Sequence, residues 1–277
     1  MEPDDFSVRF WGVRGSIPCP GPATVRYGGN TSSIEVRCGA RMLLFDAGTG
    51  IRYLGNDLAN QGPLDADLFL THTHFDHVCG LPFFRPLYRA DNSFRLWAGH
   101  LLGRTTLQRV MRTLMAAPLF PVPPEFFRAN IDYRDFHAGE TLVPGAGIRV
   151  RTAALNHPDR ATGYRVDYRG RSLCYLTDTE HVPGIRDVKI LALIGGADLV
   201  IYDAMYTDAE YAEGRSGCGH STWQEGARLC RAAGAKRLAV FHHDPDRSDD
   251  ALDALGRDLD AAIPGSVVAR EGLVLSP

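Results

Sequence analysis

Apolar and polar residues alternate in short runs along this chain, and each run ends in a turn-forming or polar residue. Runs of this kind are typical of β-strands, whose side chains point to opposite faces in turn. Strands are therefore expected in both halves of the chain. They cover residues 6–11, 33–37, 42–45, 68–70, 94–98, 148–153, 162–168, 172–176, 199–202, 237–241 and 266–269.

Three other segments have the spacing of amphipathic helices. Residues 105–115 place their apolar side chains on one face. Residues 222–233 begin with Thr222 and Glu225 at the spacing of a capping box, and Ser248 can cap a third helix. Because strands come in runs with helices interspersed, the predicted fold class is α/β of the α+β type, with two sheets packed face to face and helices outside.

Composition narrows the class of protein. The chain has 277 residues and is 44% hydrophobic, which allows a substantial core in one domain. Its 30 Lys+Arg and 33 Asp+Glu give a formal net charge of -3, which argues against a general nucleic-acid binder but not against a local basic patch. The six cysteines form no Cys-x-x-Cys pair, and scattered thiols are typical of a reducing compartment.

The sequence gives no sign of export or membrane insertion. The N-terminal residues 1–5 are acidic and lack the basic start and apolar run of a signal peptide. The apolar stretch 190–202 is too short to span a bilayer and is broken by Gly195, Gly196 and Asp198. A cytoplasmic location is therefore expected.

Candidate chemistry is concentrated in His72, His74, Asp76 and His77, directly after the predicted strand 68–70. In an extended segment side chains alternate, so His72 and His74 can point the same way. Asp76 and His77 follow in the turn and can face a second point nearby. Zinc and related divalent metals prefer imidazole and carboxylate ligands, so the stretch predicts two adjacent metals rather than a histidine-rich surface loop.

The spacing His-x-His-x-Asp-His resembles the signature of the metallo-β-lactamase superfamily, and the stretch 43–50, which contains Asp46, resembles an earlier motif of that family. The resemblance runs along almost the whole chain. It implies a four-layer αββα sandwich of two packed mixed β-sheets flanked by helices. It also implies two divalent metal ions, zinc first, with manganese or iron also compatible.

The same resemblance implies a ligand set and supporting residues. We prefer His242 to His243 as the last ligand, because it is the first residue past the strand 238–241. Asp46 and Asp67 are candidates to hold the other ring nitrogen of a metal-bound histidine. One metal is assigned to His72, His74 and His157, the other to Asp76, His77 and His242, with Asp178 between them.

Two further motifs resemble the phosphodiesterase branch of this superfamily, which includes RNase Z and cyclic-phosphate phosphodiesterases. They are the N-terminal stretches 12–18 and 28–33, and the sequence Gly-His-Ser-Thr that contains His220. His220 precedes a predicted helix N-terminus, where a protonated imidazole could contact a phosphate or donate a proton to a leaving oxygen. Alternatively, Ser221 and Thr222 merely cap the helix. The expected catalytic residues are Asp76 and His220.

The distribution of chain length differs from that of many members of this branch. RNase Z enzymes commonly carry a long arm, in many cases between the third and fourth metal motifs, and His157 and Asp178 are too close to hold one. Together with the near-neutral charge, this argues against tRNA and for a small-molecule phosphodiester as the partner. The extra length lies around 81–147, as an insertion that could cap the site within a single domain 1–277. Its apolar segment 114–127 could equally form a homodimer surface.

The expected function is therefore a dinuclear metal-dependent hydrolase, a phosphodiesterase acting on a small phosphodiester, such as a cyclic one, through a hydroxide shared by the metals. A carbonyl hydrolase, such as a lactonase, a thioesterase or a β-lactamase, uses the same kind of site and is the alternative. A redox di-iron protein usually has Glu where this chain has His74. A non-catalytic scaffold would have lost ligands, and no expected ligand is missing from the sequence.

Overall fold

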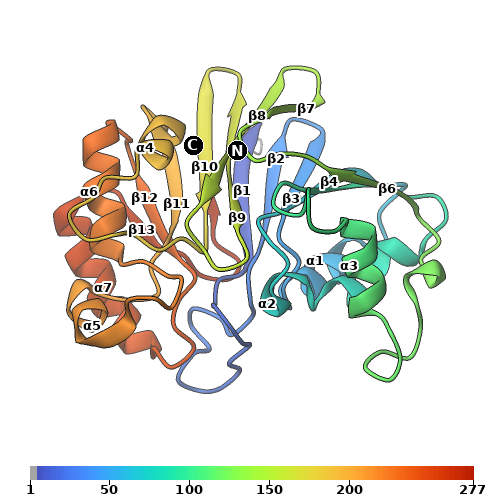
Figure 1. Cartoon of the computed structure of the whole chain (residues 1–277), viewed down its shortest axis with the longest axis horizontal. Helices are drawn as coiled ribbons and strands as arrows, with labels where there is room; N and C mark the ends of the chain where they lie inside the picture. The colour runs from blue at the N-terminus through green and yellow to red at the C-terminus, as the bar shows by residue number, and fades with distance from the viewer. Residues whose placement is uncertain (1–4) are drawn as a thin grey trace.

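The computed structural model describes residues 5–277, whose strands form two seven-stranded sheets packed face to face (Figure 1). In spatial order, the first sheet contains β14 (Val274–Leu275), β1 (Phe6–Gly12), β2 (Ser33–Cys38), β3 (Arg41–Phe45), β4 (Asp65–Leu70), β5 (Ser93–Ala98) and β6 (Asn130–Asp135). The second contains β13 (Val267–Val268), β12 (Leu238–Phe241), β11 (Leu199–Asp203), β10 (Arg171–Leu176), β9 (Ala161–Tyr168), β8 (Ile148–Leu155) and β7 (Thr141–Gly145).

Both sheets are mixed. Strands β3 to β6 run parallel in the first sheet, and β10 to β13 run parallel in the second. The carboxyl ends of parallel strands meet at one edge of a sheet, and in α/β folds the loops at that edge carry the binding sites. The short helices α2 (Phe75–Val78) and α5 (Asp208–Glu210), which follow β4 and β11, both lie on the lower side of the molecule in Figure 1.

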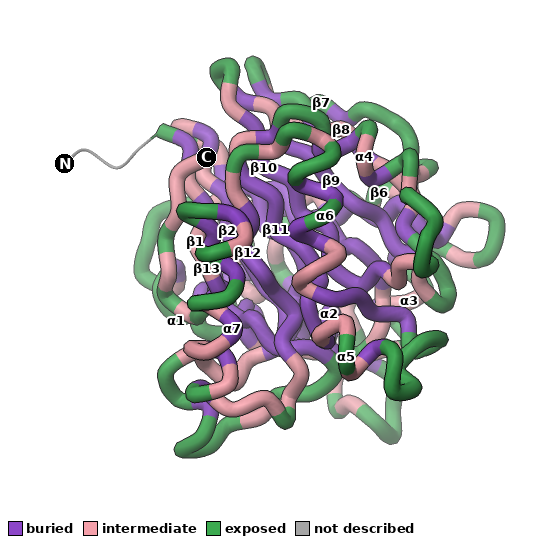
Figure 2. Tube along the Cα trace, turned by 90° about the vertical axis from the view of Figure 1, so that its left-hand side faces the viewer, coloured by how far each residue is buried: buried purple, intermediate pink, exposed green. Residues whose placement is uncertain are grey.

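The layers are joined by apolar clusters. Aromatic rings from both sheets meet in the cluster between them, where the rings of Phe10 and Phe241 lie 6.0 Å apart and those of Phe45 and Tyr175 lie 5.8 Å apart. Figure 2 shows buried residues following the strands through the centre, with exposed residues in the outer loops. Helices cover the outer faces, namely α1 (Ile51–Leu58) and α3 (Leu107–Leu114) on the first sheet, and α4 (Val188–Ile194), α6 (Trp223–Ala233) and α7 (Asp249–Ala262) on the second.

This arrangement confirms the expected αββα sandwich. Two helices begin at the caps expected from the sequence, Thr222 and Ser248, and a third begins at Thr106, which the sequence did not single out. The hydroxyl groups of Thr106, Thr222 and Ser248 each accept a backbone hydrogen bond at the start of α3, α6 and α7. Gly234 ends α6 with a left-handed φ of 65°, a conformation that a residue without Cβ adopts at little cost.

One apolar run divides in a way that the pattern does not predict. Residues 190–202 contain the end of α4, a turn at Gly195 and Gly196, and most of β11. Asp187 begins α4 by accepting hydrogen bonds from the backbone N–H groups of Lys189 and Ile190. A buried helix and a buried strand are both apolar, so hydrophobicity alone cannot separate them.

The segment 81–147 supplies sheet strands as well as surface structure. Strands β5 and β6 extend the first sheet in parallel with β4, and β7 forms the edge of the second sheet. The proline-rich loop between α3 and η3 (Pro124–Phe126) hangs on the lower side of the molecule in Figure 1, as α2 does. Whether this segment caps the active site, within one domain, stays a prediction. The remaining short helices are η1 (Leu81–Phe83), η2 (Arg85–Tyr88) and the π-helical turn η4 (Tyr211–Arg215).

Among residues 5–277, no helix combines the length and the apolar character needed to cross a bilayer. The acidic N-terminal stretch includes residues 1–4, which lie outside the described residues, so its interpretation stays a prediction.

Candidate metal centre

Seven of the predicted site residues follow the ends of strands in both sheets, five of them in loops and two, Asp76 and His77, in helix α2. They form overlapping groups in which the donor atoms lie within 4.8 Å of one another. The residues are His72, His74, Asp76 and His77 after β4, His157 after β8, Asp178 after β10 and His242 after β12. We refer to these seven residues as the ligand cluster.

The first group in the cluster consists of His72, His74 and His157. The Nε2 atom of His157 lies 3.1 Å from Nδ1 of His74, and the rings of His72 and His74 are 4.5 Å apart. Burial lowers the pKa of both His72 and His157. These imidazoles are therefore neutral at pH 7, as metal ligation requires.

The second group consists of Asp76, His77 and His242, all of which are buried. The Oδ2 atom of Asp76 lies 3.2 Å from Nε2 of His77 and 3.5 Å from Nε2 of His242. Burial alone would raise the pKa of Asp76, but His77 and His242 hold it below its usual value. Asp76 is therefore ionised at neutral pH.

Asp178 lies between the two groups and presents one carboxylate oxygen to each. Its Oδ1 atom is 3.7 Å from Nε2 of both His72 and His157. Its Oδ2 atom is 3.1 Å from Nε2 of His77 and 3.3 Å from Nε2 of His242. A carboxylate oriented in this way can contact two adjacent cations at once.

Backbone strain is concentrated at the same place. Asp46, Asp178 and His242 have φ values of 56°, 60° and 59°. A residue with a side chain in this left-handed region costs about 1–3 kcal/mol, and such residues tend to cluster at functional sites. Each of the three follows a strand, so the strained turn directs its side chain toward the cluster.

The residues fit a pair of divalent cations. Within residues 5–277, no hydrogen-bond partner is found for the buried Nε2 atoms of His72, His77 and His242. A buried polar atom without a partner is costly, and a metal ion would satisfy all three. The imidazole and carboxylate donors also match the preferences of zinc and related metals.

Asp46 supports the ligand cluster from behind, as expected. Its Oδ2 atom accepts hydrogen bonds from Nδ1 of His77 and from the hydroxyl of Tyr175, each at 2.9 Å. It also accepts a hydrogen bond from the hydroxyl of Thr71. The bond to His77 leaves Nε2 of that ring directed at the cluster, a common way to orient a metal ligand.

Asp67 does not have the same role, and the expectation that it supports a ligand was wrong. Its carboxylate binds Arg41 and Arg95 and accepts a hydrogen bond from Trp97 Nε1 at 2.9 Å. Asp67 is the third residue of β4, so it lies well before the strand end where the ligands begin.

His243 and Arg14 also lie outside the ligand cluster. His243 is buried next to His242, but its Nε2 atom donates to the carbonyl of Ala269 at 2.8 Å. The guanidinium of Arg14 is fully buried and donates to the carbonyls of Gly28 and Arg247, among others. Arg14 therefore joins loops and is not available to a phosphate.

A second histidine–aspartate pair lies beside the cluster. Nδ1 of His220 donates to Oδ2 of Asp203 at 2.9 Å and lies 3.9 Å from Oδ1 of Asp178. The rings of His220 and His242 are stacked 4.9 Å apart. Asp203 also accepts the backbone N–H groups of Thr179 and Met205, which fix its carboxylate.

Asp203 favours the protonated form of His220. Burial alone would lower the pKa of His220, but the charge and hydrogen bond of Asp203, with Asp178 further away, raise it to about 9. From the sequence alone, Asp203 could support a ligand, face the substrate or be an ordinary turn carboxylate. Its only signal was its place at the end of β11, on the edge that carries the ligands.

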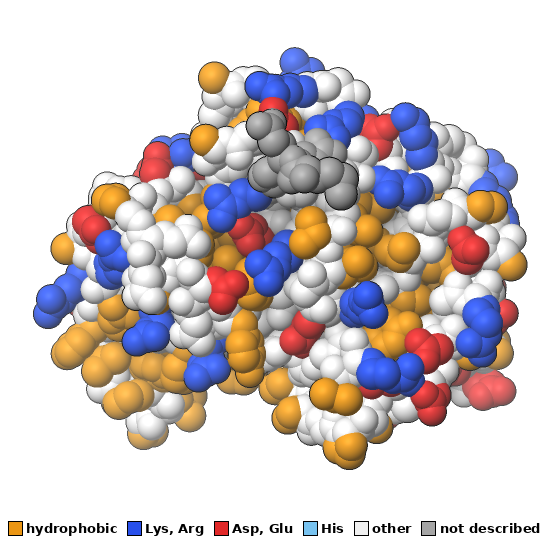
Figure 3. All heavy atoms as spheres, turned by 180° about the vertical axis from the view of Figure 1, so that it is seen from behind, with side chains coloured by type: hydrophobic (Ala, Val, Ile, Leu, Met, Phe, Trp, Pro, Cys, Tyr) orange, Lys and Arg blue, Asp and Glu red, His pale blue; other side chains and the backbone are white. Residues whose placement is uncertain are grey.

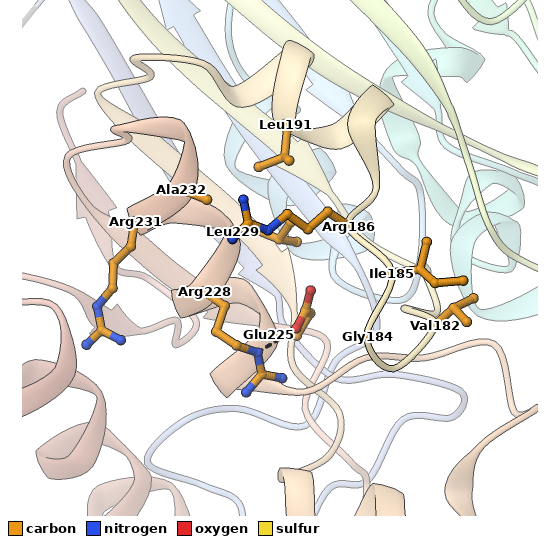
Figure 4. A pocket seen from close by; sticks show the side chains of 10 residues that line it. All are labelled: Val182, Gly184, Ile185, Arg186, Leu191, Glu225, Arg228, Leu229, Arg231 and Ala232. Carbon is orange, nitrogen blue, oxygen red and sulfur yellow. Dashed lines mark hydrogen bonds and ion pairs between the residues drawn. The ribbon is translucent and has the colours of Figure 1, made fainter.

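A separate cavity of about 530 Å³ lies between α4, α6 and the turn 182–186 (Figure 4). It contains none of the ligand cluster, nor His220 or Asp203. Arg228 on its wall is already bound to Asp208 and Glu225. The cavity is therefore separate from the candidate metal centre.

The model of the β-lactamase superfamily domain family matches residues 41–243, well over half of the chain. The chain belongs to this family. It is accordingly a metal-dependent hydrolase of the metallo-β-lactamase superfamily.

Three similar proteins extend the comparison. Ribonuclease Z of Gemmatimonas aurantiaca is 25% identical over 96% of this chain and 94% of its own length. The crystal structure of the short form of human tRNase Z has a TM-score of 0.66 at 20% identity, covering 98% of both chains. The zinc-bound PqqB of Methylobacterium extorquens has a TM-score of 0.71 at 20% identity, covering 98% of this chain and 100% of that one. The two structural comparisons show the fold alone.

The relatives correct one expectation about this superfamily member. The argument against tRNA, and for a small-molecule partner in its place, was wrong, because a relative that spans nearly the whole chain is named Ribonuclease Z. Net charge was a poor guide because it averages over the surface, where Figure 3 shows basic and acidic side chains interspersed. RNA binding depends on local groups instead.

Proposed function

We propose that this hydrolase is a two-metal phosphodiesterase that cleaves RNA. One observation carries the proposal: Nδ1 of His220 is hydrogen-bonded to Asp203 and lies 3.9 Å from Asp178, the carboxylate between the two ligand groups. Cleavage of a phosphodiester with a poor leaving group requires a proton donor next to the metal centre.

In this proposal each ligand group would hold one divalent cation, and Asp178 would serve both. We propose zinc, because nitrogen and oxygen ligands in this number suit it; manganese and iron accept the same donors. Two such cations would lower the pKa of the water that attacks phosphorus and offset negative charge on the non-bridging oxygens. The groups are His72, His74 and His157, and Asp76, His77 and His242.

The side chains of the protein provide orientation and proton transfer. Asp76 is ionised and accepts the backbone N–H of Ser16 at 2.9 Å, which leaves it able to accept a hydrogen bond from the attacking water. As the water oxygen bonds to phosphorus and the opposite P–O bond breaks, His220 transfers its proton to the departing oxygen. Asp203 stabilises the charged imidazole beforehand.

RNA is proposed as the substrate because of the relatives. Ribonuclease Z of Gemmatimonas aurantiaca aligns with 96% of this chain, so the likeness is not limited to the metal motifs. The carbonyl hydrolases considered from the sequence share the ligands but give no particular role to the His220–Asp203 pair.

The first experiment combines metal content with a substrate panel. The purified protein is analysed by mass spectrometry for metals, then assayed with a precursor tRNA bearing a 3′ extension, a cyclic nucleotide, a lactone and a β-lactam. We expect about two metals per chain and cleavage of the precursor. Asp178→Ala is the matched inactive control, since it removes the carboxylate shared by both groups.

Each other outcome contradicts a defined part of the proposal. Turnover of the cyclic nucleotide alone would support phosphodiesterase activity and contradict RNA as the substrate. Turnover of only the lactone or the β-lactam would reject phosphodiester chemistry. The protein could also bind fewer than one metal per chain after reconstitution with zinc, manganese and iron, and show no turnover. That result would contradict the proposal that it is a two-metal enzyme.

A further inference from the structure

A shallow cavity of about 290 Å³ opens beside the ligand cluster, between the loop after β4 and helix α3. Thr73, Phe75 and Val78 line one side, and Val110 and Leu114 line the other. Because Phe75 stands between His74 and Asp76 in the sequence, its Cα lies about 3.8 Å from the Cα of each. The segment that carries His72, His74 and Asp76 therefore also lines the cavity.

Phe75 is the most unusual residue of this cavity. Its side chain is 71% exposed, whereas its neighbours Asp76 and His77 are buried. Across residues 5–277, no aromatic ring packs against the ring of Phe75. A large exposed aromatic side chain next to a reaction centre offers a flat apolar surface to a substrate.

A cationic side chain without a partner completes the cavity. Arg109 on α3 lines it, and no side-chain hydrogen bond or ion pair of Arg109 occurs in the described part of the chain. Its neighbour along the wall, Thr105, follows Arg104, which lies 3.4 Å from Asp159. The carboxylate of Asp159 is 3.8 Å from Nε2 of His74, so two contacts connect the segment 104–105 beside the cavity with His74.

We infer that this cavity binds a nucleobase of the substrate next to the scissile phosphate, stacked on Phe75, with Arg109 available to the neighbouring phosphate. The inference rests on the proposed cleavage of RNA. Single-stranded nucleic acids are commonly bound by base stacking on exposed aromatic rings combined with cationic side chains. The volume suits one flat ring system rather than a larger ligand.

Binding of product-like ligands to the metal-loaded protein tests the inference without catalysis. Uridine 5′-monophosphate and ribose 5-phosphate carry the same phosphate, and only the first has a base. Stacking of one base is worth roughly 5- to 140-fold in affinity. We therefore expect uridine 5′-monophosphate to bind at least about 5-fold more tightly in calorimetric titration.

Variants of Phe75 assign the difference to stacking. Phe75→Ala should bring the dissociation constant of uridine 5′-monophosphate to that of ribose 5-phosphate, and Phe75→Trp should restore the gap because it keeps an aromatic face. Phe75 is largely exposed, so neither change should prevent folding. Phe126→Ala is the matched control, because Phe126 is 58% exposed but lies on η3 outside the cavity.

Arg109 is tested with a longer ligand. Arg109→Gln should weaken a 5′-phosphorylated uridine dinucleotide more than the mononucleotide, because only the dinucleotide has a second phosphate. Equal effects on both ligands would remove Arg109 from the proposed site.

The outcomes separate this inference from the proposed function. Equal affinity for the two monophosphates would contradict the nucleobase site even if the enzyme cleaves RNA. So would an affinity difference that is unchanged in Phe75→Ala. An affinity difference between the two ligands that depends on Phe75, in a protein that does not cleave RNA, would support the nucleobase site and contradict the proposed reaction.

Discussion

Residues 5–277 contain two buried histidine–aspartate pairs that are alike in their hydrogen bond and different in their surroundings. In each, Nδ1 of the histidine lies 2.9 Å from a carboxylate oxygen, in His77–Asp46 and in His220–Asp203. The side chain of His77 is completely buried, and its Nε2 atom points between Asp76 and Asp178. That of His220 retains 11% exposure, and its ring packs on His242 at the side of the cluster.

The difference shows that the hydrogen-bonded carboxylate does not by itself decide what a histidine does. For His77, every direction open to Nε2 leads to other ligands, so a cation is the partner that satisfies it. For His220, the ring lies beside the cluster and its side chain retains 11% exposure, so we propose that it can pass its proton to a substrate. We therefore interpret one pair as a metal ligand with its support and the other as an acid with its support.

The largest expected effect comes from His77→Ala. It removes a donor of the second group and leaves Asp46, Asp76 and Asp178 as neighbouring carboxylates with less positive charge between them. Metal content should fall from about two per chain to one or fewer, and RNA cleavage should be undetectable. His137→Ala, which removes an exposed imidazole, is the control. Full metal content in His77→Ala would contradict the ligand role.

His220→Ala should separate the pairs, because it leaves every proposed ligand in place. Metal content should stay at about two per chain, while kcat for RNA should fall by about 10²–10⁴-fold, the usual contribution of a general acid. Loss of metal in this variant would mean that His220 is a ligand like His77, and the comparison would fail.

Replacing the carboxylate of Asp46 or of Asp203 by an amide should have smaller effects, on metal binding in the first case and on kcat in the second. Asp46→Asn should weaken metal binding by about 10–100-fold, as is typical when the group behind a ligand is lost. Asp203→Asn should leave metal content unchanged and lower kcat. It should also lower the pKa of His220, because Asp203 contributes most of the rise to about 9.

The pH profile of Asp203→Asn gives the sign of that effect. A lower pKa means that His220 loses its proton at lower pH, so the alkaline limb of the rate profile should move toward neutral pH. An alkaline limb at the wild-type position would show that Asp203 does not act on His220.

The two pairs also show what the sequence could predict. His77 lies in a contiguous motif, and Asp46 lies in a second motif that resembles one of the family, so both were found from local sequence. Asp203 and His220 are brought together by a parallel bridge between Tyr206 and Thr222, which follow them along the chain, and no local pattern links them. Asp67 was chosen because it precedes the ligands along the chain, but its place within β4 binds it to Arg41 and Arg95 instead.

The smallest predicted effect tests the acid role most directly, because it compares two leaving groups within one variant. A nucleoside hydroxyl is a poor leaving group and needs a proton as the P–O bond breaks, whereas p-nitrophenolate is a stable anion and needs little help. The loss of kcat in His220→Ala should therefore shrink to about 10-fold or less with bis(p-nitrophenyl) phosphate. If His220 only binds phosphate charge, both substrates have that charge and should lose activity equally. Equal losses would leave the His220–Asp203 pair as a binding element and remove the chemical distinction between the two pairs.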